Sequence, residues 1–189
     1  IRLSRYKILI LGPIVLAAML SLTYVVSSSF QSKVASTIED MDSWGKGAEI
    51  NHKSMAMRIE AYKVATVVIK ENPLGTGAHH QKDAILEVYD RENSVLTIDN
   101  RKEPHNQFLE FGVKYGWVGI LALVVLFIVL FRLVGFTTFP FVGLLVVLLV
   151  SMQFESLLER QVSIYFISLF IPLFYHLFGR KTINGSLLT

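Results

Sequence analysis

Long apolar runs are the feature that most restricts what this chain can fold into. Such runs cover roughly residues 8–26, 118–131, 139–152 and 162–178 of the 189 residues, and 52% of the chain is hydrophobic. A helix rises about 1.5 Å per residue, so about 20 apolar residues cross a hydrocarbon core of about 30 Å. With flanking aromatic and small residues counted in, the runs predict an all-α polytopic membrane protein with four transmembrane helices.

One long polar segment separates the first two runs, and a connection of that length has to carry structure or function. We expect this segment to form one large, mainly helical extracytoplasmic loop. The predicted organisation is one span in 1–27, the loop domain in 28–116, three spans in 117–179 with a short periplasmic loop near 153–161, and a cytoplasmic tail in 180–189.

Within the loop, helix-breaking and turn-forming residues divide the segment into shorter helices. We predict helices over about 30–38, 51–70 and 79–90, with turn-rich sequence at 39–47 and irregular sequence at 91–103. Asn72-Pro73 stops the second of these, because proline disfavours the helical conformation of the residue before it. The following Gly75-Thr76-Gly77 predicts a tight turn and lacks the Gly-Lys-Ser/Thr ending of a phosphate loop.

Basic residues at the ends of the runs set the expected orientation. If the N-terminal end is cytoplasmic, all Asp and Glu residues fall on the other side, while the cytoplasmic side carries Arg2, Arg5, Lys7, Arg132, Arg180 and Lys181. The basic residues behind the net charge of +3 therefore indicate membrane orientation and not a phosphate-binding patch. We expect no nucleic-acid partner. The chain has no cysteine, so neither disulfides nor thiolate chemistry are available. It starts at Ile1 and not at Met, and we expect a piece of a larger polytopic protein.

His105 is the candidate catalytic residue, since it lies just before the second span. An imidazole with an ordinary pKa near 6.5 accepts a proton from a hydroxyl at working pH. The alternative is that His105 caps the helix or only hydrogen-bonds at the interface. Asn106 orients or caps in either case, and we list it as a candidate substrate-binding residue.

Arg58 and Tyr62 are the other candidate substrate-binding residues. They share one helical face with Ala61, Ala65 and Ile69. A guanidinium matches two phosphate oxygens at once, although an ordinary surface ion pair is the simpler interpretation of Arg58.

Other polar groups favour no site. His79 with Asp83 has a helical ligand spacing, but two ligands do not make a metal site, so we expect neither a metal nor a cofactor. Glu155 and Glu159 either hold a basic site residue or the acceptor at the membrane edge, or form an exposed ion pair with Arg160.

The order and spacing of four motifs resemble the C-terminal half of the O-antigen ligase and polymerase family, over about residues 55–134. The motifs are Arg58 in its helix, Asn-Pro-Leu-Gly-Thr-Gly at 72–77, Pro-His-Asn-Gln-Phe-Leu-Glu at 104–110, and Tyr-Gly-Trp-Val-Gly-Ile at 115–120. The resemblance implies a multi-pass inner-membrane glycosyltransferase of lipopolysaccharide biosynthesis with a large periplasmic loop.

The resemblance also implies partners and roles. A glycan moves from an undecaprenyl-diphosphate carrier to a hydroxyl of an acceptor glycan or glycolipid, lipid A-core in the ligases. Arg58 matches the loop Arg that holds the donor diphosphate, and His105 matches the base for the acceptor. The family has a further Arg in an earlier segment that this chain does not contain, so the fragment alone is expected to be inactive. The remaining N-terminal spans of the same protein are therefore expected partners. Membrane lipids are also expected partners.

Alternative functions stay open at this stage. Within the class, the protein is a polymerase or a protein O-oligosaccharyltransferase. Outside it, the chain is a non-enzymatic membrane protein whose loop binds a partner, or a transporter; few charges in the spans argue against transport.

Overall fold

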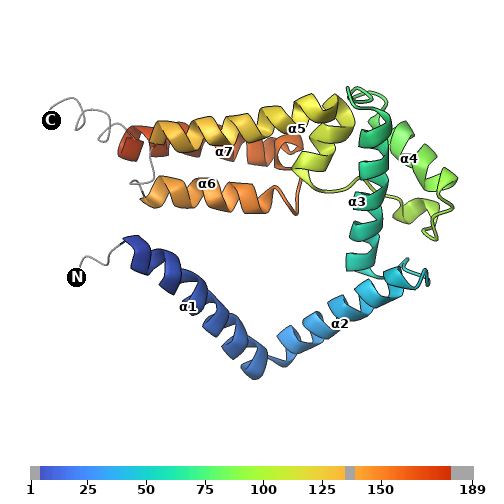
Figure 1. Ribbon diagram of the computed structural model, residues 1–189, viewed down its shortest axis with the longest axis horizontal. Coiled ribbons are helices and arrows are strands. Elements are labelled where there is room, and N and C mark those ends of the chain that lie inside the picture. The colour runs from blue at the N-terminus through green and yellow to red at the C-terminus, as the bar shows by residue number, and fades with distance from the viewer. Residues whose placement is uncertain (1–4, 135–138, 180–189) are drawn as a thin grey trace. The chain divides into compact units, whose positions relative to one another are not determined.

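The computed structural model describes residues 5–134 and 139–179, and these contain helices and no strand (Figure 1). Contacts divide the chain into two units, residues 1–56 and 57–189, and each is described by itself. The longer helices are α1 (Arg5–Val26), α2 (Ser28–Gly45), α3 (Ser54–Glu71), α4 (Gln81–Arg91), α5 (Gln107–Val134), α6 (Phe139–Ser151) and α7 (Gln161–Phe174). Short helical turns are η1 (Ile98–Asn100), η2 (Leu157–Glu159) and η3 (Tyr175–Gly179).

The first unit is a bent pair of helices. The axes of 14–26 and Ser28–Gly45 are bent by 101° at the intervening residue. Ser27 caps α2, because its Oγ accepts a hydrogen bond of 3.2 Å from the backbone N–H of Phe30. The predicted turn-rich stretch at 39–47 is wrong, since α2 continues to Gly45. A Lys46–Asp42 ion pair of 2.6 Å helps to extend this last turn, where a cation also complements the helix dipole.

In the second unit α5, α6 and α7 run side by side (Figure 1) and share a small apolar core. Phe127 of α5 packs in one cluster with Leu148 and Met152, and Phe141 and Leu145 of α6 form another. Many other apolar side chains on these helices are exposed. Such a surface is costly in water but natural against lipid tails or further helices.

The predicted four-span topology is not confirmed. Within the described residues, one helix is long and apolar enough to cross a membrane, 107–133, and the bent pair of the first unit makes a second candidate if it counts as one span. The third and fourth predicted spans correspond to shorter apolar helices, 140–151 and 161–177. The expected turn near 135–138 and the tail at 180–189 lie outside the described residues.

Helices α3 and α4 each bury one stripe at helical spacing. In α3 the stripe contains Val64, Ala65 and Val68, and in α4 it contains Ile85, Val88 and Tyr89. Ion pairs tie the two helices together, Arg91–Glu71 at 2.5 Å and Lys63–Glu92 at 3.3 Å. The predicted stop before Asn72 is confirmed, whereas α4 begins at Gln81, two residues after the predicted start.

A sharp kink divides α5 at Gly116, which has φ 64° and ψ −154°. The turn after α3 packs against this kink and makes the hydrogen bonds that the broken helix loses. Thr76 N–H donates to Val113 O at 2.8 Å, Gly77 N–H donates to Lys114 O at 2.9 Å, and Pro73 O accepts from Trp117 N–H at 3.0 Å.

Two glycines permit this close approach. A Cβ at Gly116 would lie 2.0 Å from Pro73 O, and one at Gly75 would lie 2.3 Å from Lys114 O. The sequence predicts the turn, but neither the kink nor the contact between them. The Asn-Pro-Leu-Gly-Thr-Gly and Tyr-Gly-Trp motifs are therefore two sides of one junction.

Candidate functional site

The start of α5 is anchored on the connection between α6 and α7, residues 152–160. Asn106 is the N-cap, because its Oδ1 accepts from Phe108 N–H at 2.9 Å and Leu109 N–H at 3.1 Å. Its Nδ2 also donates to Gln153 O at 3.1 Å. The buried Gln107 completes the anchor, since its N–H donates to Met152 O and its Oε1 accepts from a backbone N–H of the connection. Capping is thus done by Asn106 and not by its neighbour His105.

Arg58 and Tyr62, one turn apart on α3, reach the same connection. Tyr62 Oη donates to Gln153 O at 3.0 Å, and Arg58 Nη1 donates to Phe154 O at 3.2 Å. Three of the predicted site residues, Arg58, Tyr62 and Asn106, therefore converge on two consecutive carbonyl groups. The predicted shared face of α3 explains why Arg58 and Tyr62 arrive together.

His105 occupies an unusual backbone conformation between two buried residues. Its φ is 45°, in the left-handed region that side chains other than glycine seldom adopt, and Pro104 and Asn106 on either side are buried. Strained residues of this kind occur preferentially at functional sites. Among residues 5–134 and 139–179, no hydrogen bond to the His105 ring is present, so its nitrogens are available to a ligand.

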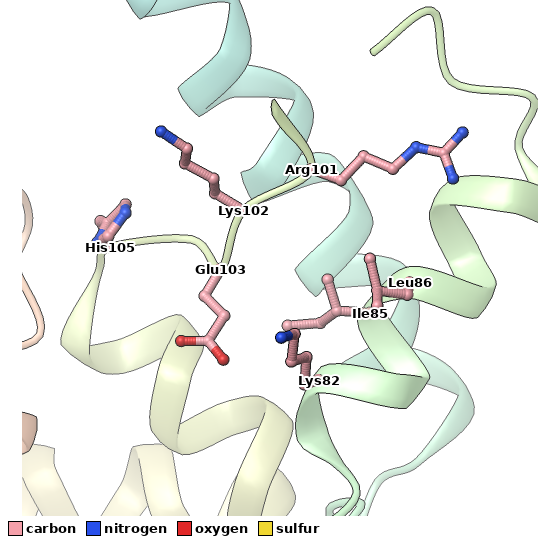
Figure 2. Close-up of a pocket in the computed structure, with 7 residues that line it drawn as sticks. All are labelled: Lys82, Ile85, Leu86, Arg101, Lys102, Glu103 and His105. Carbon is pink, nitrogen blue, oxygen red and sulfur yellow. The ribbon is translucent and has the colours of Figure 1, made fainter. Parts of the chain in front are cut away.

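The His105 ring borders two pockets of similar size. The first, here called the basic pocket, has a volume of about 360 Å³ and lies between α4 and the segment before α5 (Figure 2). Figure 2 shows Lys82 and Glu103 turned into this space and Arg101 turned away from it. Arg101 forms an ion pair with Asp90. Its lining residues are Lys82, Ile85, Leu86, Arg101, Lys102, Glu103 and His105. This set carries an excess of cations and suits an anionic group.

The second, here called the Glu110 pocket, has a volume of about 370 Å³. Mainly polar residues line it, from α4, α5, the segments just before these two helices, and the 152–160 connection. They are Ala78, Gln81, Glu103, His105, Glu110, Lys114, Ser156, Glu159 and Arg160. Arg58 and Tyr62 are in neither lining set, so the structure groups them with Asn106 and not with the pockets that His105 borders.

Glu110 and Lys114 form a buried ionic cluster in this pocket. Lys114 Nζ lies 3.3 Å from Glu110 Oε1 and 2.8 Å from Glu159 Oε2, and Gln81 Nε2 donates to Glu110 Oε1. Glu159 therefore holds a basic residue, one of the two roles considered for it. The partner of Glu155 is Arg160, at 2.7 Å, in the more exposed pair that was also considered.

Glu103 links the two pockets and is electrostatically perturbed. Partial burial of the carboxylate raises the pKa of Glu103, and the negative charge of Glu110 raises it further. Lys114, His105 and Lys82 act in the opposite direction but do not outweigh these effects. The site thus holds a carboxyl group that protonates more readily than an ordinary glutamate.

Sequence reasoning gave no role to Gln81, Glu103, Glu110 or Lys114. The available signal was the pair Glu110 and Lys114, four residues apart on one helical face at the entrance to an apolar run. The histidines considered for metal do not gather, and no group of three or more His, Cys, Asp or Glu able to hold a metal occurs in the described part of the chain.

In the described residues, the structure thus combines one helix long and apolar enough to cross a membrane with two pockets near its start. Comparison with protein families then places it. A family model described as O-antigen ligase matches residues 1–124, well over half of the chain, and the chain belongs to the O-antigen ligase family. No curated protein and no solved structure gives a significant match.

Membership establishes the general function. The family is membrane-associated and implies glycosyltransferase-like activity related to lipopolysaccharide, with a lipid-linked glycan and an acceptor as substrates. The resemblance seen in the sequence motifs is thereby confirmed at the level of the family.

Proposed function

We propose that this chain is the C-terminal part of a ligase that moves a glycan from undecaprenyl diphosphate to a hydroxyl of lipid A-core. His105 is the general base, and Arg58 stabilises the leaving diphosphate. Asn106 positions His105 by fixing the start of α5, and Tyr62 holds the same connection as Arg58 and contacts the substrate beside it. Residues 28–116 and 153–161 face the periplasm, and the protein resides in the inner membrane.

The proposed step is an inverting displacement. A His105 ring nitrogen takes the proton of the acceptor hydroxyl, and the oxygen attacks the anomeric carbon on the face opposite the diphosphate. The bond from that carbon to the diphosphate oxygen breaks, and undecaprenyl diphosphate leaves with the electron pair. Arg58 supplies positive charge to the leaving group, as a divalent ion does in other transferases, so the reaction is proposed to be metal-independent.

The observation that carries the proposal is the state of His105. Its ring has no hydrogen-bond partner in the described residues and borders two pockets, and its backbone is held in the left-handed region at φ 45°. A histidine with a purely structural role would use its ring nitrogens, and the capping role belongs to Asn106. These features favour a base over a helix cap.

Support for Arg58 comes from its unused donors. A guanidinium has five N–H groups, and in the described residues Arg58 uses one of them, on Phe154 O. It is half-buried, which strengthens its interaction with an anion relative to bulk water. Arg58 lines neither pocket. Variants of Arg58 therefore test whether its guanidinium contacts the donor diphosphate.

Replacing His105 by Ala in the full-length protein should reduce glycan transfer about 100-fold or more, since positioned general bases contribute about that much. Transfer to lipid A-core is measured in membranes by gel separation of lipopolysaccharide. His80→Ala is the matched control, because His80 is exposed and its side chain makes no cap bond. Normal transfer by a correctly inserted His105→Ala protein would remove the base from the mechanism.

Replacing Arg58 by Ala should abolish transfer, and Arg58→Lys should recover only part of it, because an ammonium cannot bind two oxygens in the bidentate geometry. Transfer assays with purified undecaprenyl-diphosphate glycan measure the effect, with the exposed Lys70→Ala on the same helix as control. Chelation by EDTA should leave the wild-type rate unchanged. An Arg58→Lys protein as active as wild type, or a rate that falls on chelation, would contradict the role given to Arg58.

A further inference from the structure

Glu110 carries an unsatisfied acceptor in an otherwise packed environment. The residue is 3% exposed. Its Oε1 accepts a hydrogen bond from Gln81 Nε2 and forms an ion pair with Lys114 Nζ. Its Oε2 is buried and has no hydrogen-bond partner among the described residues. Burying a carboxylate oxygen without a hydrogen-bond donor costs free energy. A ligand that donates a hydrogen bond to Oε2 would remove this cost.

The charges around the Glu110 pocket restrict what that donor is. Lys114 lies between Glu110 and Glu159 and already neutralises part of their charge, so the pocket does not need a further cation. A phosphate would meet the carboxylates of Glu103, Glu110 and Glu159. The other cation of the lining, Arg160, is already paired with Glu155. A neutral hydroxyl group satisfies Oε2 without adding charge, and Gln81 and Ser156, both buried, provide further polar groups for a polyhydroxylated ligand.

Size and position also fit a sugar. The volume of about 370 Å³ lies within the range of about 300–1,000 Å³ for small-ligand pockets. The pocket borders His105, so a hydroxyl of a ring bound there lies beside the proposed base. The neighbouring basic pocket, with Lys82 and Lys102, has the opposite chemical character.

We infer that the Glu110 pocket binds the acceptor sugar, with Glu110 Oε2 accepting a hydrogen bond from one of its hydroxyl groups. This inference rests on the proposed function and adds the location of the acceptor and the residue that selects it. Glu110 is a substrate-binding residue in this arrangement. Gln81 and Lys114 are positioning residues, because they hold the other carboxylate oxygen.

The test compares Glu110→Gln with wild type in the full-length protein. The acceptor KM should rise about tenfold or more, the size expected for losing a hydrogen bond to a charged group, while the donor KM stays unchanged. Glu87→Gln, an exposed carboxylate on α4, is the matched control. Ala78→Phe is a second variant, since Ala78 is exposed on the pocket wall and a ring there fills the space without disturbing the core.

A binding measurement separates this inference from the proposed function. Soluble core oligosaccharide, the acceptor glycan released from its lipid, is titrated into the detergent-solubilised full-length protein and followed by calorimetry. His105→Ala should bind it like wild type, whereas Glu110→Gln and Ala78→Phe should bind about tenfold more weakly or worse.

Wild-type affinity in both pocket variants would overturn the inference and leave His105 catalysis untouched. Normal transfer by His105→Ala would overturn the proposed function, whatever Glu110 does. An equal rise of donor and acceptor KM in Glu110→Gln would also overturn the inference, because it would indicate a general disturbance of the site.

Discussion

The two halves of α5 differ in which side chains they bury and which they expose. Before the kink at Gly116, Gln107, Glu110 and Lys114 are buried and polar or charged, at 0%, 3% and 9% exposure. After it, Val118 and Leu121 are apolar and 63% and 62% exposed. Folding in water alone favours the reverse arrangement in both halves. Across the kink, α5 thus passes from a polar half packed by protein to a half whose outer surface suits lipid.

The difference between the two halves arises where the 73–77 turn packs against the kink at Gly116. Hydrogen bonds from the 73–77 turn satisfy the backbone groups released at Gly116, so the first half is free to change direction and meet α4 and the 152–160 connection. Its polar side chains then find partners on those elements. The second half packs Phe127 against Leu148 of α6, while apolar side chains on its outer surface, such as Val118 and Leu121, stay exposed.

Lys114→Met should have the largest effect, because it removes the cation from the polar half. Glu110 and Glu159 would then face each other with a buried charge uncompensated, and breaking a buried pair in this way costs about 3–5 kcal/mol. Thermal unfolding of the purified protein in detergent measures the loss. The double variant Lys114→Met/Glu110→Gln should recover part of it, and a single variant as stable as wild type would mean that the cluster is not a buried ionic pair.

Gly116→Ala should have the second-largest effect on stability, because it disturbs the kink that joins the two halves of α5. The added Cβ meets Pro73 O and the residue is held at φ 64°, and strain of this kind costs about 1–3 kcal/mol before the loop shifts. Transfer activity should fall with stability, since the first half of α5 loses its direction. Gly143→Ala on α6, which has no atom within 4 Å of the new Cβ, should be neutral by the same unfolding measurement.

Glu103→Gln should have the smallest effect and a pH dependence of known sign. Because the folded pKa of Glu103 is raised, the folded state favours the protonated acid, and stability falls as pH rises from the ordinary carboxylate range through the raised value. The variant should match wild type at about pH 4 and unfold at a higher temperature near pH 7.5. A difference that grows instead toward low pH would contradict the assigned direction of the Glu103 pKa shift.

Several elements followed from local sequence. The end of α3 before Asn72-Pro73 was predicted because proline restricts the residue before it, and the helical face of Arg58 and Tyr62 followed from spacing. The turn-rich 39–47 prediction failed because acidic and small residues were read as a break, whereas Lys46 pairs with Asp42 and the helix continues. The sequence predicted the apolar span only from about residue 117, because the first half of α5 is polar and lacks the apolar signal of a span.

The site was predictable only in part. His105 and Asn106 drew attention by their position before a span, and Arg58 by its charge on an apolar face. The roles of Glu110, Gln81 and Lys114 did not emerge, because Gln81 lies 29 residues from Glu110 and nothing local indicates that they meet. The pockets likewise require α4, α5 and the 152–160 connection to be brought together.

By itself the sequence determined that this is an all-helical membrane protein with a polar loop, and its motifs indicated the family. Apolar periodicity, proline and glycine act on the backbone within a few residues, so they can be read along the chain. Only the tertiary structure decided that the 73–77 turn seals the kink at Gly116, that Glu110 keeps one carboxylate oxygen unpaired, and that His105 borders two chemically different pockets. Those facts depend on contacts between distant segments, whose energies are not written in any local pattern.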